Sequence, residues 1–123
     1  MAESGFNGLR VLIIEDESIV AMLLEDALAD LGCSVVGIAS RLDEAMGKVS
    51  SLAFDAAILD VNLNGFQTYL VAEALTQRGI PFVLSTGYGT AGLPEVFQDV
   101  PLLGKPFQQS DLQRTLAAAL SGR

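Results

Sequence analysis

Short apolar runs alternate along the chain with stretches in which apolar residues recur every three or four positions. Runs rich in branched aliphatic residues are typical of strands buried on both faces of a parallel sheet, and the longer spacing is typical of amphipathic helices. The five predicted strands cover residues 9–14, 34–38, 56–59, 82–85 and 102–103. The predicted helices cover residues 18–31, 42–49 and 66–78 and the last segment through Leu120.

The first predicted helix has the clearest pattern of the helices. Its apolar residues recur at helical steps, and Gly32 follows as a stop signal. Ser110 is predicted to cap the last helix, and residues 93–100 carry the weakest pattern. The first helix is predicted to turn inward the side chains of Ile19, Met22, Leu23, Ala27 and Leu31.

The alternation of strands and helices predicts an α/β fold with an open parallel sheet covered by helices on both faces. Ligands of such sheets bind beyond the carboxyl ends of the strands. Four separated parts of the chain therefore bring polar side chains to one edge of the sheet. These are Glu15, Asp16, Asp60, Thr86 and Lys105.

This edge has the composition of a metal-dependent phosphoryl site. Its three carboxylates would repel one another without a cation, and oxygen ligands without His or Cys favour Mg²⁺. Lys105 and Thr86 add an ammonium and a hydroxyl that suit an oxyanion. Asp60 ends a central strand alone, so it is the predicted phosphoryl acceptor, whereas the adjacent Glu15 and Asp16 are predicted metal ligands.

Each of these residues also has a simpler structural interpretation. Glu15 and Asp16 would suit the acidic start of a helix, and for this pair alone the two interpretations are about even. Asp60 would suit a turn, and Asn62 an Asx turn. The functional interpretation is favoured because four strand ends carry complementary chemistry at once.

Composition narrows the function further. The chain has 123 residues, 50% hydrophobic and 18% charged, which fits one folded domain. The net charge of −8 argues against nucleic-acid binding. No apolar run is long enough to span a membrane and no signal peptide is evident, so the protein is expected in the cytoplasm. With the lone Cys33 and no His, zinc sites and internal disulfides are excluded.

From about Leu9 to Leu120 the chain resembles the receiver domains of two-component response regulators. The resemblance rests on VLIIEDE at residues 11–17, ILDVN at 58–62, LSTG at 84–87 and KPF at 105–107. It implies a flavodoxin-like receiver fold, a single domain over residues 1–123 with a five-stranded sheet in the order 2-1-3-4-5.

The resemblance also implies a role for each residue of the predicted edge. Glu15 and Asp16 bind Mg²⁺, Asp60 is phosphorylated, and the backbone carbonyl of Asn62 completes the protein ligands of the metal. Thr86 is the switch hydroxyl. Lys105 binds the phosphate, and the bond from Lys105 to Pro106 is a candidate cis peptide.

The chain departs from common receivers in three places. The usual Met-Pro after the acceptor is absent and Gly65 comes early, which predicts a shorter loop. The usual aromatic residue three positions before the lysine is Leu102. The motif PFVLSTGYG at residues 81–89 resembles that of the stand-alone bacterial FATGUY group, in which Tyr88 or the loop around it would replace the missing switch.

The resemblance implies a bacterial response regulator receiver that takes a phosphoryl group from a sensor histidine kinase or a histidine phosphotransfer protein. It would signal through protein–protein contact with a downstream protein, and its only catalysis would be self-phosphorylation and autodephosphorylation. Two alternatives are an inactive pseudo-receiver adaptor and a receiver fragment of a longer regulator. A metal-dependent phosphatase is less favoured, because that class has Asp-x-Asp where this chain has Asn62.

Overall fold

The computed structural model describes residues 6–63, 65–87, 93–97 and 99–121. Five parallel strands form the central sheet, in the order β2-β1-β3-β6-β7. Their bounds are β1 Arg10–Ile14, β2 Ser34–Ala39, β3 Ala56–Asp60, β6 Phe82–Thr86 and β7 Leu102–Gly104. The helices are α1 Ser18–Asp30, α2 Leu42–Ser51, α3 Tyr69–Gln77 and α4 Gln109–Ser121, with a short 3-10 helix η1 at Glu95–Phe97.

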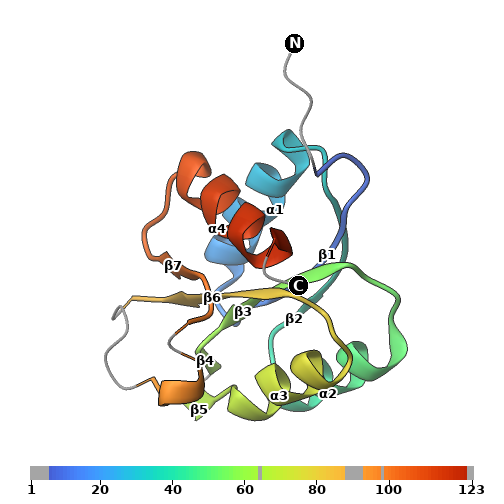
Figure 1. Ribbon diagram of the computed structural model, residues 1–123, viewed down its shortest axis with the longest axis vertical. Coiled ribbons are helices and arrows are strands. Elements are labelled where there is room, and N and C mark those ends of the chain that lie inside the picture. Colours follow the sequence, from blue (N-terminus) through green and yellow to red (C-terminus); the bar gives the residue numbers. More distant parts are fainter. Residues whose placement is uncertain (1–5, 64, 88–92, 98, 122–123) are drawn as a thin grey trace.

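The strand order confirms the predicted topology. Two further strands, β4 (Asn62–Leu63) and β5 (Phe66–Gln67), pair only with each other in a separate antiparallel hairpin. The hairpin lies outside the central sheet, so β6 and β7 are the fourth and fifth strands of that sheet. The strand order is therefore the expected 2-1-3-4-5. Figure 1 shows α1 and α4 on one side of the sheet and α2 and α3 on the other.

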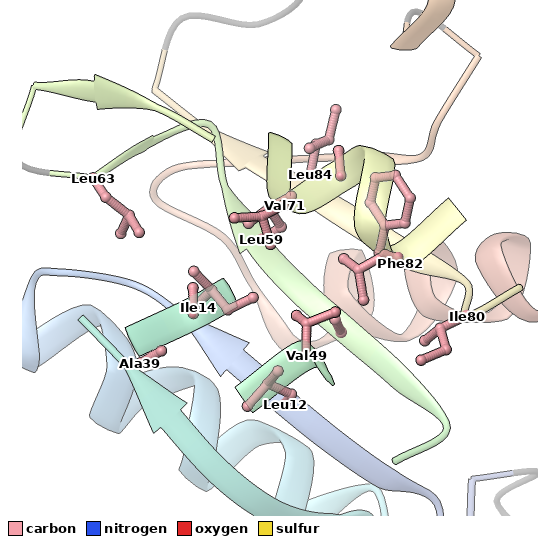
Figure 2. Close-up of a cluster of buried hydrophobic side chains, with 14 of the residues drawn as sticks. Leu12, Ile14, Ala39, Val49, Leu59, Leu63, Val71, Ile80, Phe82 and Leu84 are labelled. Atoms are coloured by element: carbon pink, nitrogen blue, oxygen red, sulfur yellow. The ribbon is translucent and has the colours of Figure 1, made fainter. Parts of the chain in front are cut away.

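Alternate side chains of the strands point into two separate hydrophobic cores. On β1, Leu12 and Ile14 face α2 and α3, and Figure 2 shows this core. Val11 and Ile13 face α1 and α4. Both sets are fully buried, as expected for a sheet covered on both faces. The two cores fix the strands, and therefore the positions of the residues at their carboxyl ends.

The buried face of α1 differs from the predicted one. Ala21, Leu24 and Leu28 pack against the sheet, and of the predicted residues Leu31 is buried and Ala27 half-buried. The others stay exposed, with exposed fractions of 71% for Ile19, 60% for Met22 and 55% for Leu23. Both faces of this helix are apolar at helical spacing, so periodicity alone could not decide which one is buried.

The connection after β3 also differs from the prediction. Helix α3 begins at Tyr69 rather than Phe66, because residues 62–63 and 66–67 pair as the β4–β5 hairpin. Gly65 sits in its turn with φ 87°, a conformation that side chains disfavour. The connection after Asp60 therefore contains a hairpin before α3, and its shortness relative to common receivers stays a prediction.

The start of the last helix differs from the prediction, and the peptide bond before it agrees with the resemblance. Helix α4 begins at Gln109, so Ser110 lies inside it and is not its cap. The Gln108 N–H donates instead to Asp111 Oδ2 at 3.0 Å. The peptide bond between Lys105 and Pro106 is cis, as the resemblance implied. Every helix in the described part of the chain is too short or too polar to cross a bilayer.

Candidate functional site

Lys105 ties together the carboxyl ends of two central strands. It follows β7, and its Nζ lies 3.0 Å from Glu15 Oε1 and 3.0 Å from Asp60 Oδ2. Glu15 immediately follows β1 and Asp60 is the last residue of β3. A third acid, the exposed Glu17, has Oε1 3.6 Å from the same ammonium. The structure thus brings the predicted lysine and two of the predicted acids into direct contact.

The three predicted carboxylates form one cluster. Glu15, Asp16 and Asp60 each offer an oxygen within 4.8 Å of the others. Glu15 and Asp60 are buried, and Asp16 is half-buried. Three carboxylates against the single ammonium of Lys105 leave an excess of negative charge in a small space, and their oxygens suit a hard divalent cation. The cluster can therefore hold a metal ion.

The ionisation of this cluster is perturbed. Burial and, to a smaller extent, the neighbouring Asp60 raise the pKa of Glu15, the hydrogen bond with Lys105 lowers it, and the net pKa is about 7. Burial alone would lower the pKa of Lys105, but its contacts with Glu15 and Asp60 outweigh burial and hold that pKa above its ordinary value. Strongly shifted groups gathered in a cleft are typical of functional sites.

The Asp60 side chain and backbone are both held in place. Its Oδ1 accepts a hydrogen bond from the Asn62 N–H at 3.1 Å, and Oδ2 accepts one from Lys105 at 3.0 Å. Its carbonyl oxygen accepts a hydrogen bond from Thr68 Oγ1 at 2.5 Å. Sequence reasoning missed Thr68 because it lay inside the helix predicted over residues 66–78. A buried hydroxyl directly before α3 thus fixes the backbone of Asp60.

Asn62 lies at the start of the hairpin. Its side-chain Oδ1 accepts a hydrogen bond from the Gly65 N–H at 2.8 Å, which is the turn-forming role of its simpler interpretation. That contact involves only the side chain of Asn62. The metal-binding role of its backbone carbonyl therefore stays a prediction.

Thr86 ends β6 and is buried. Its carbonyl oxygen accepts a hydrogen bond from the Lys105 N–H at 3.0 Å, so the two residues are adjacent across the β6–β7 edge. Tyr88 and the rest of the predicted switch loop, residues 88–92, lie outside the described residues. Leu102 is half-buried on β7, where common receivers carry an aromatic residue.

A cavity of about 600 Å³ opens over the cluster. Five of the predicted residues line it, namely Asp16, Asp60, Asn62, Thr86 and Lys105. Gln67 of the hairpin and Tyr69 at the start of α3 form part of its wall. The Tyr69 ring stacks on Phe97 of η1 at 5.6 Å between centroids. The cavity is large enough to admit a phosphoryl group together with part of its donor.

Comparison with known proteins agrees with this geometry. The sequence matches the response regulator receiver domain family over residues 11–117. The chain belongs to this family. This receiver domain is therefore a part of bacterial two-component signal transduction, and its family consists of signalling proteins rather than enzymes of metabolism.

Curated relatives of this receiver domain are longer proteins. The transcriptional regulatory protein PdtaR of Mycobacterium tuberculosis is 32% identical over 118 residues, which cover 91% of this chain and 57% of PdtaR. The phyllosphere-induced regulator PhyR of Methylorubrum extorquens is 32% identical over 120 residues, which cover 90% of this chain and 43% of PhyR. The receiver domain thus spans about half the length of these relatives.

The solution structure of SdrG from Sphingomonas melonis Fr1 matches along nearly its whole length. It has a TM-score of 0.84 and 41% identity, over 98% of this chain and 99% of SdrG. A beryllofluoride-activated conformation of SdrG, from Pseudomonas melonis Fr1, matches with a TM-score of 0.79 and 44% identity, over 90% of this chain and 95% of SdrG. The FATGUY-type subgroup remains a prediction, because these matches identify the family only.

Proposed function

We propose that this chain works as one receiver domain that accepts a phosphoryl group on Asp60 and signals through protein–protein contact. The observation that carries the proposal is the Asp60 carboxylate, which lines the cavity, lies 3.0 Å from the Lys105 ammonium and shares a cluster with Glu15 and Asp16. A carboxylate nucleophile, a cation for the incoming oxyanion and ligands for a metal are the parts that phosphoryl transfer requires.

The carboxylates of Glu15, Asp16 and Asp60 would hold a Mg²⁺ ion, with the backbone carbonyl of Asn62 as a further ligand. The ion would neutralise negative charge on the incoming phosphoryl group. The cluster fits Mg²⁺ because its ligands are oxygens and its charge exceeds what Lys105 balances.

The residues of this chain supply the nucleophile and the orientation. A carboxylate oxygen of Asp60 forms a bond to phosphorus while the bond from phosphorus to the donor breaks, and the donor keeps the electron pair. Lys105 binds the phosphoryl oxygens, and the Thr86 hydroxyl donates to them after transfer. The product carries about 1.5 to 2 added negative charges, which is the signal that a downstream protein reads.

An apolar surface on α1 supports a protein as phosphodonor. Ile19, Met22 and Leu23 are exposed there. An adjoining groove of about 540 Å³, lined in part by Leu23 and Phe107, also reaches Lys105. Contiguous exposed apolar side chains mark protein contact sites, and the net charge of −8 disfavours a nucleic acid. We propose that a sensor histidine kinase or a histidine phosphotransfer protein docks on this surface in the cytoplasm.

The phosphorylation itself is tested by intact mass after incubation with acetyl phosphate, with and without Mg²⁺. The wild-type protein is expected to gain one phosphoryl group only with Mg²⁺, and Asp60→Asn is expected to gain none. Asp55→Asn, a matched change at the opposite end of β3, should react like wild type. Absence of an adduct, together with unchanged amide NMR shifts in Mg²⁺ and beryllofluoride, would contradict the proposal and favour an inactive adaptor.

The docking surface has its own test, because small phosphodonors do not need it. The donor for this test is a phosphorylated histidine phosphotransfer protein that reacts with wild type. Leu23→Lys is expected to slow phosphoryl transfer from this donor by about tenfold or more. Its reaction with acetyl phosphate should be unchanged. Leu70→Lys is the control, since Leu70 is similarly exposed, at 61%, on α3. Equal transfer rates in both variants would place the donor on another surface.

A further inference from the structure

A buried hydroxyl next to the site has no evident structural use. Ser85 of β6 is 1% exposed, and its Oγ has no hydrogen-bond partner among the described residues. Two other buried hydroxyls show the usual arrangement: Thr68 donates to the Asp60 carbonyl, and Thr115 donates to the carbonyls of Asp111 and Leu112. A buried polar group left without a partner costs stability, so a persistent one needs an explanation.

The sheet register places Ser85 beside the proposed phosphoryl acceptor. Ser85 is the residue of β6 that pairs with Asp60 of β3. Residues in register on parallel strands point to the same face of the sheet. Two positions earlier, Val83 and Ile58 occupy the same register and both pack into the core under α1 and α4. Ser85 and Asp60 therefore lie on that face, at the carboxyl edge of neighbouring strands.

Lys105 extends across the same place. It follows β7, and its Nζ contacts Asp60 at the end of β3 and Glu15 beyond β1. In the sheet, β6 lies between β7 and β3. The lysine side chain must therefore pass over the carboxyl end of β6, where Ser85 sits one residue before Thr86. The hydroxyl thus lies among the groups that would surround a phosphorylated Asp60.

We infer that the Ser85 hydroxyl donates a hydrogen bond to the side chain of phosphorylated Asp60. This inference rests on the proposed function. In the unphosphorylated protein, the two carboxylate oxygens of Asp60 accept from Lys105 and from the Asn62 N–H, and the Ser85 hydroxyl has no partner among the described residues. The phosphoryl group adds acceptor oxygens and draws the Lys105 ammonium towards itself. The Ser85 hydroxyl therefore gains a hydrogen-bond acceptor only in the phosphorylated state.

The inference makes a prediction of two opposite signs for Ser85→Ala. The unphosphorylated variant should unfold at a higher temperature than wild type, because an unsatisfied buried hydroxyl is removed. Beryllofluoride, which stands in for the phosphoryl group, should bind the variant roughly tenfold more weakly in saturating Mg²⁺, since a hydrogen bond to a charged group is lost. A residue with a purely packing role would not separate the two states in this way.

The experiment is a beryllofluoride titration followed by amide NMR, with thermal unfolding of the same samples. Ser34→Ala, at the exposed start of β2, is the control and should match wild type in both. Ser85→Cys keeps a side chain of similar size and a weak hydrogen-bond donor, so its affinity for beryllofluoride should lie between those of wild type and Ser85→Ala. Ser85→Cys also provides a second test if Ser85→Ala does not fold.

Two failures can be told apart. Equal beryllofluoride affinity in wild type, Ser85→Ala and Ser85→Cys would overturn the role of Ser85 and leave the acceptor role of Asp60 intact. Absence of beryllofluoride binding by wild type would overturn the proposed function, and the role of Ser85 with it.

Discussion

Strands β1 and β3 carry charged groups at both of their ends, and the two ends differ in exposure and in the balance of charge. At the amino end, Arg10 and Asp55 form a two-pronged salt bridge, with Nη2–Oδ1 at 3.0 Å and Nε–Oδ2 at 3.1 Å. Their side chains are 49% and 33% exposed, and one charge balances the other. At the carboxyl end, the side chains of Lys105, Glu15 and Asp60 are 18%, 1% and 7% exposed.

The difference shows which cluster is built for chemistry. An exposed, balanced pair is screened by water and contributes little to stability. A buried cluster with more acids than bases is costly and would be replaced by apolar residues if folding alone decided. The carboxyl end keeps its unbalanced charge, and the charge is what a metal ion and a phosphoryl group require. The same two strands thus carry a structural pair at one end and a reactive site at the other.

The largest expected effect follows from removing the cation at the carboxyl end. Lys105→Met leaves Glu15 and Asp60 without their partner, and should lower the free energy of unfolding at pH 8 by roughly 3 kcal/mol in the absence of metal. It should also slow phosphorylation by acetyl phosphate at least a hundredfold. Urea unfolding and intact mass measure the two effects.

The control for Lys105→Met is Arg10→Met, which removes the cation at the amino end. It should leave the phosphorylation rate unchanged. Similar losses of rate in the two variants would mean that the two ends do not differ in function.

A smaller effect is expected from the backbone contact that fixes Asp60. Thr68→Val removes the hydroxyl that donates to the Asp60 carbonyl, and should lower the free energy of unfolding by about 1–2 kcal/mol. Phosphorylation should slow by about tenfold, because the nucleophile is less well placed. Thr76→Val is the matched control, since the Thr76 hydroxyl only adds a second bond within α3. Normal phosphorylation kinetics in Thr68→Val would show that the contact serves folding alone.

Glu15→Gln tests the repulsion within the cluster. The folded-state pKa of Glu15, about 7, lies above its ordinary value of 4.5. Stability that depends on the protonated carboxyl is therefore complete below about pH 4.5 and lost as the pH rises through 7. Glutamine resembles the protonated form, so it should stabilise the metal-free protein by about 1 kcal/mol at pH 8 and scarcely at pH 5. A gain that is equal at both pH values would refute this origin.

The smallest effect is expected at the amino end. Asp55→Asn breaks the exposed pair with Arg10, whose contribution is small and screened by salt. Thermal unfolding of variant and wild type should differ slightly at low salt and coincide at high salt. A large, salt-independent loss would mean that this pair is as important to the fold as the buried cluster.

The sequence predicted the carboxyl-end site well because parallel strands collect their ends at one edge. Glu15, Asp60 and Lys105 follow apolar runs that only a buried strand explains, so their meeting needed no knowledge of contacts. The face of α1 could not be predicted in the same way. Ile19 and Leu24 are both apolar at helical spacing, and only packing against the sheet decides which one is buried.

Thr68 and Ser85 escaped prediction for a related reason. Each is a small hydroxyl residue inside a segment assigned as a regular element, so no pattern set it apart. The β4–β5 hairpin was hidden too, because the apolar Phe66 continues the apolar spacing of α3. Contacts across the fold, and not periodicity, bring Thr68 to the Asp60 carbonyl.

The central claim is that Asp60, and no other acid, takes the phosphoryl group. Its most direct test is to phosphorylate the protein with acetyl phosphate and Mg²⁺, reduce the product with borohydride, and map the peptides by mass spectrometry. Borohydride converts an aspartyl phosphate to homoserine and leaves free carboxylates unchanged. The account predicts homoserine at residue 60 alone. Homoserine at residue 16 or 55, or none at all in phosphorylated protein, would contradict it.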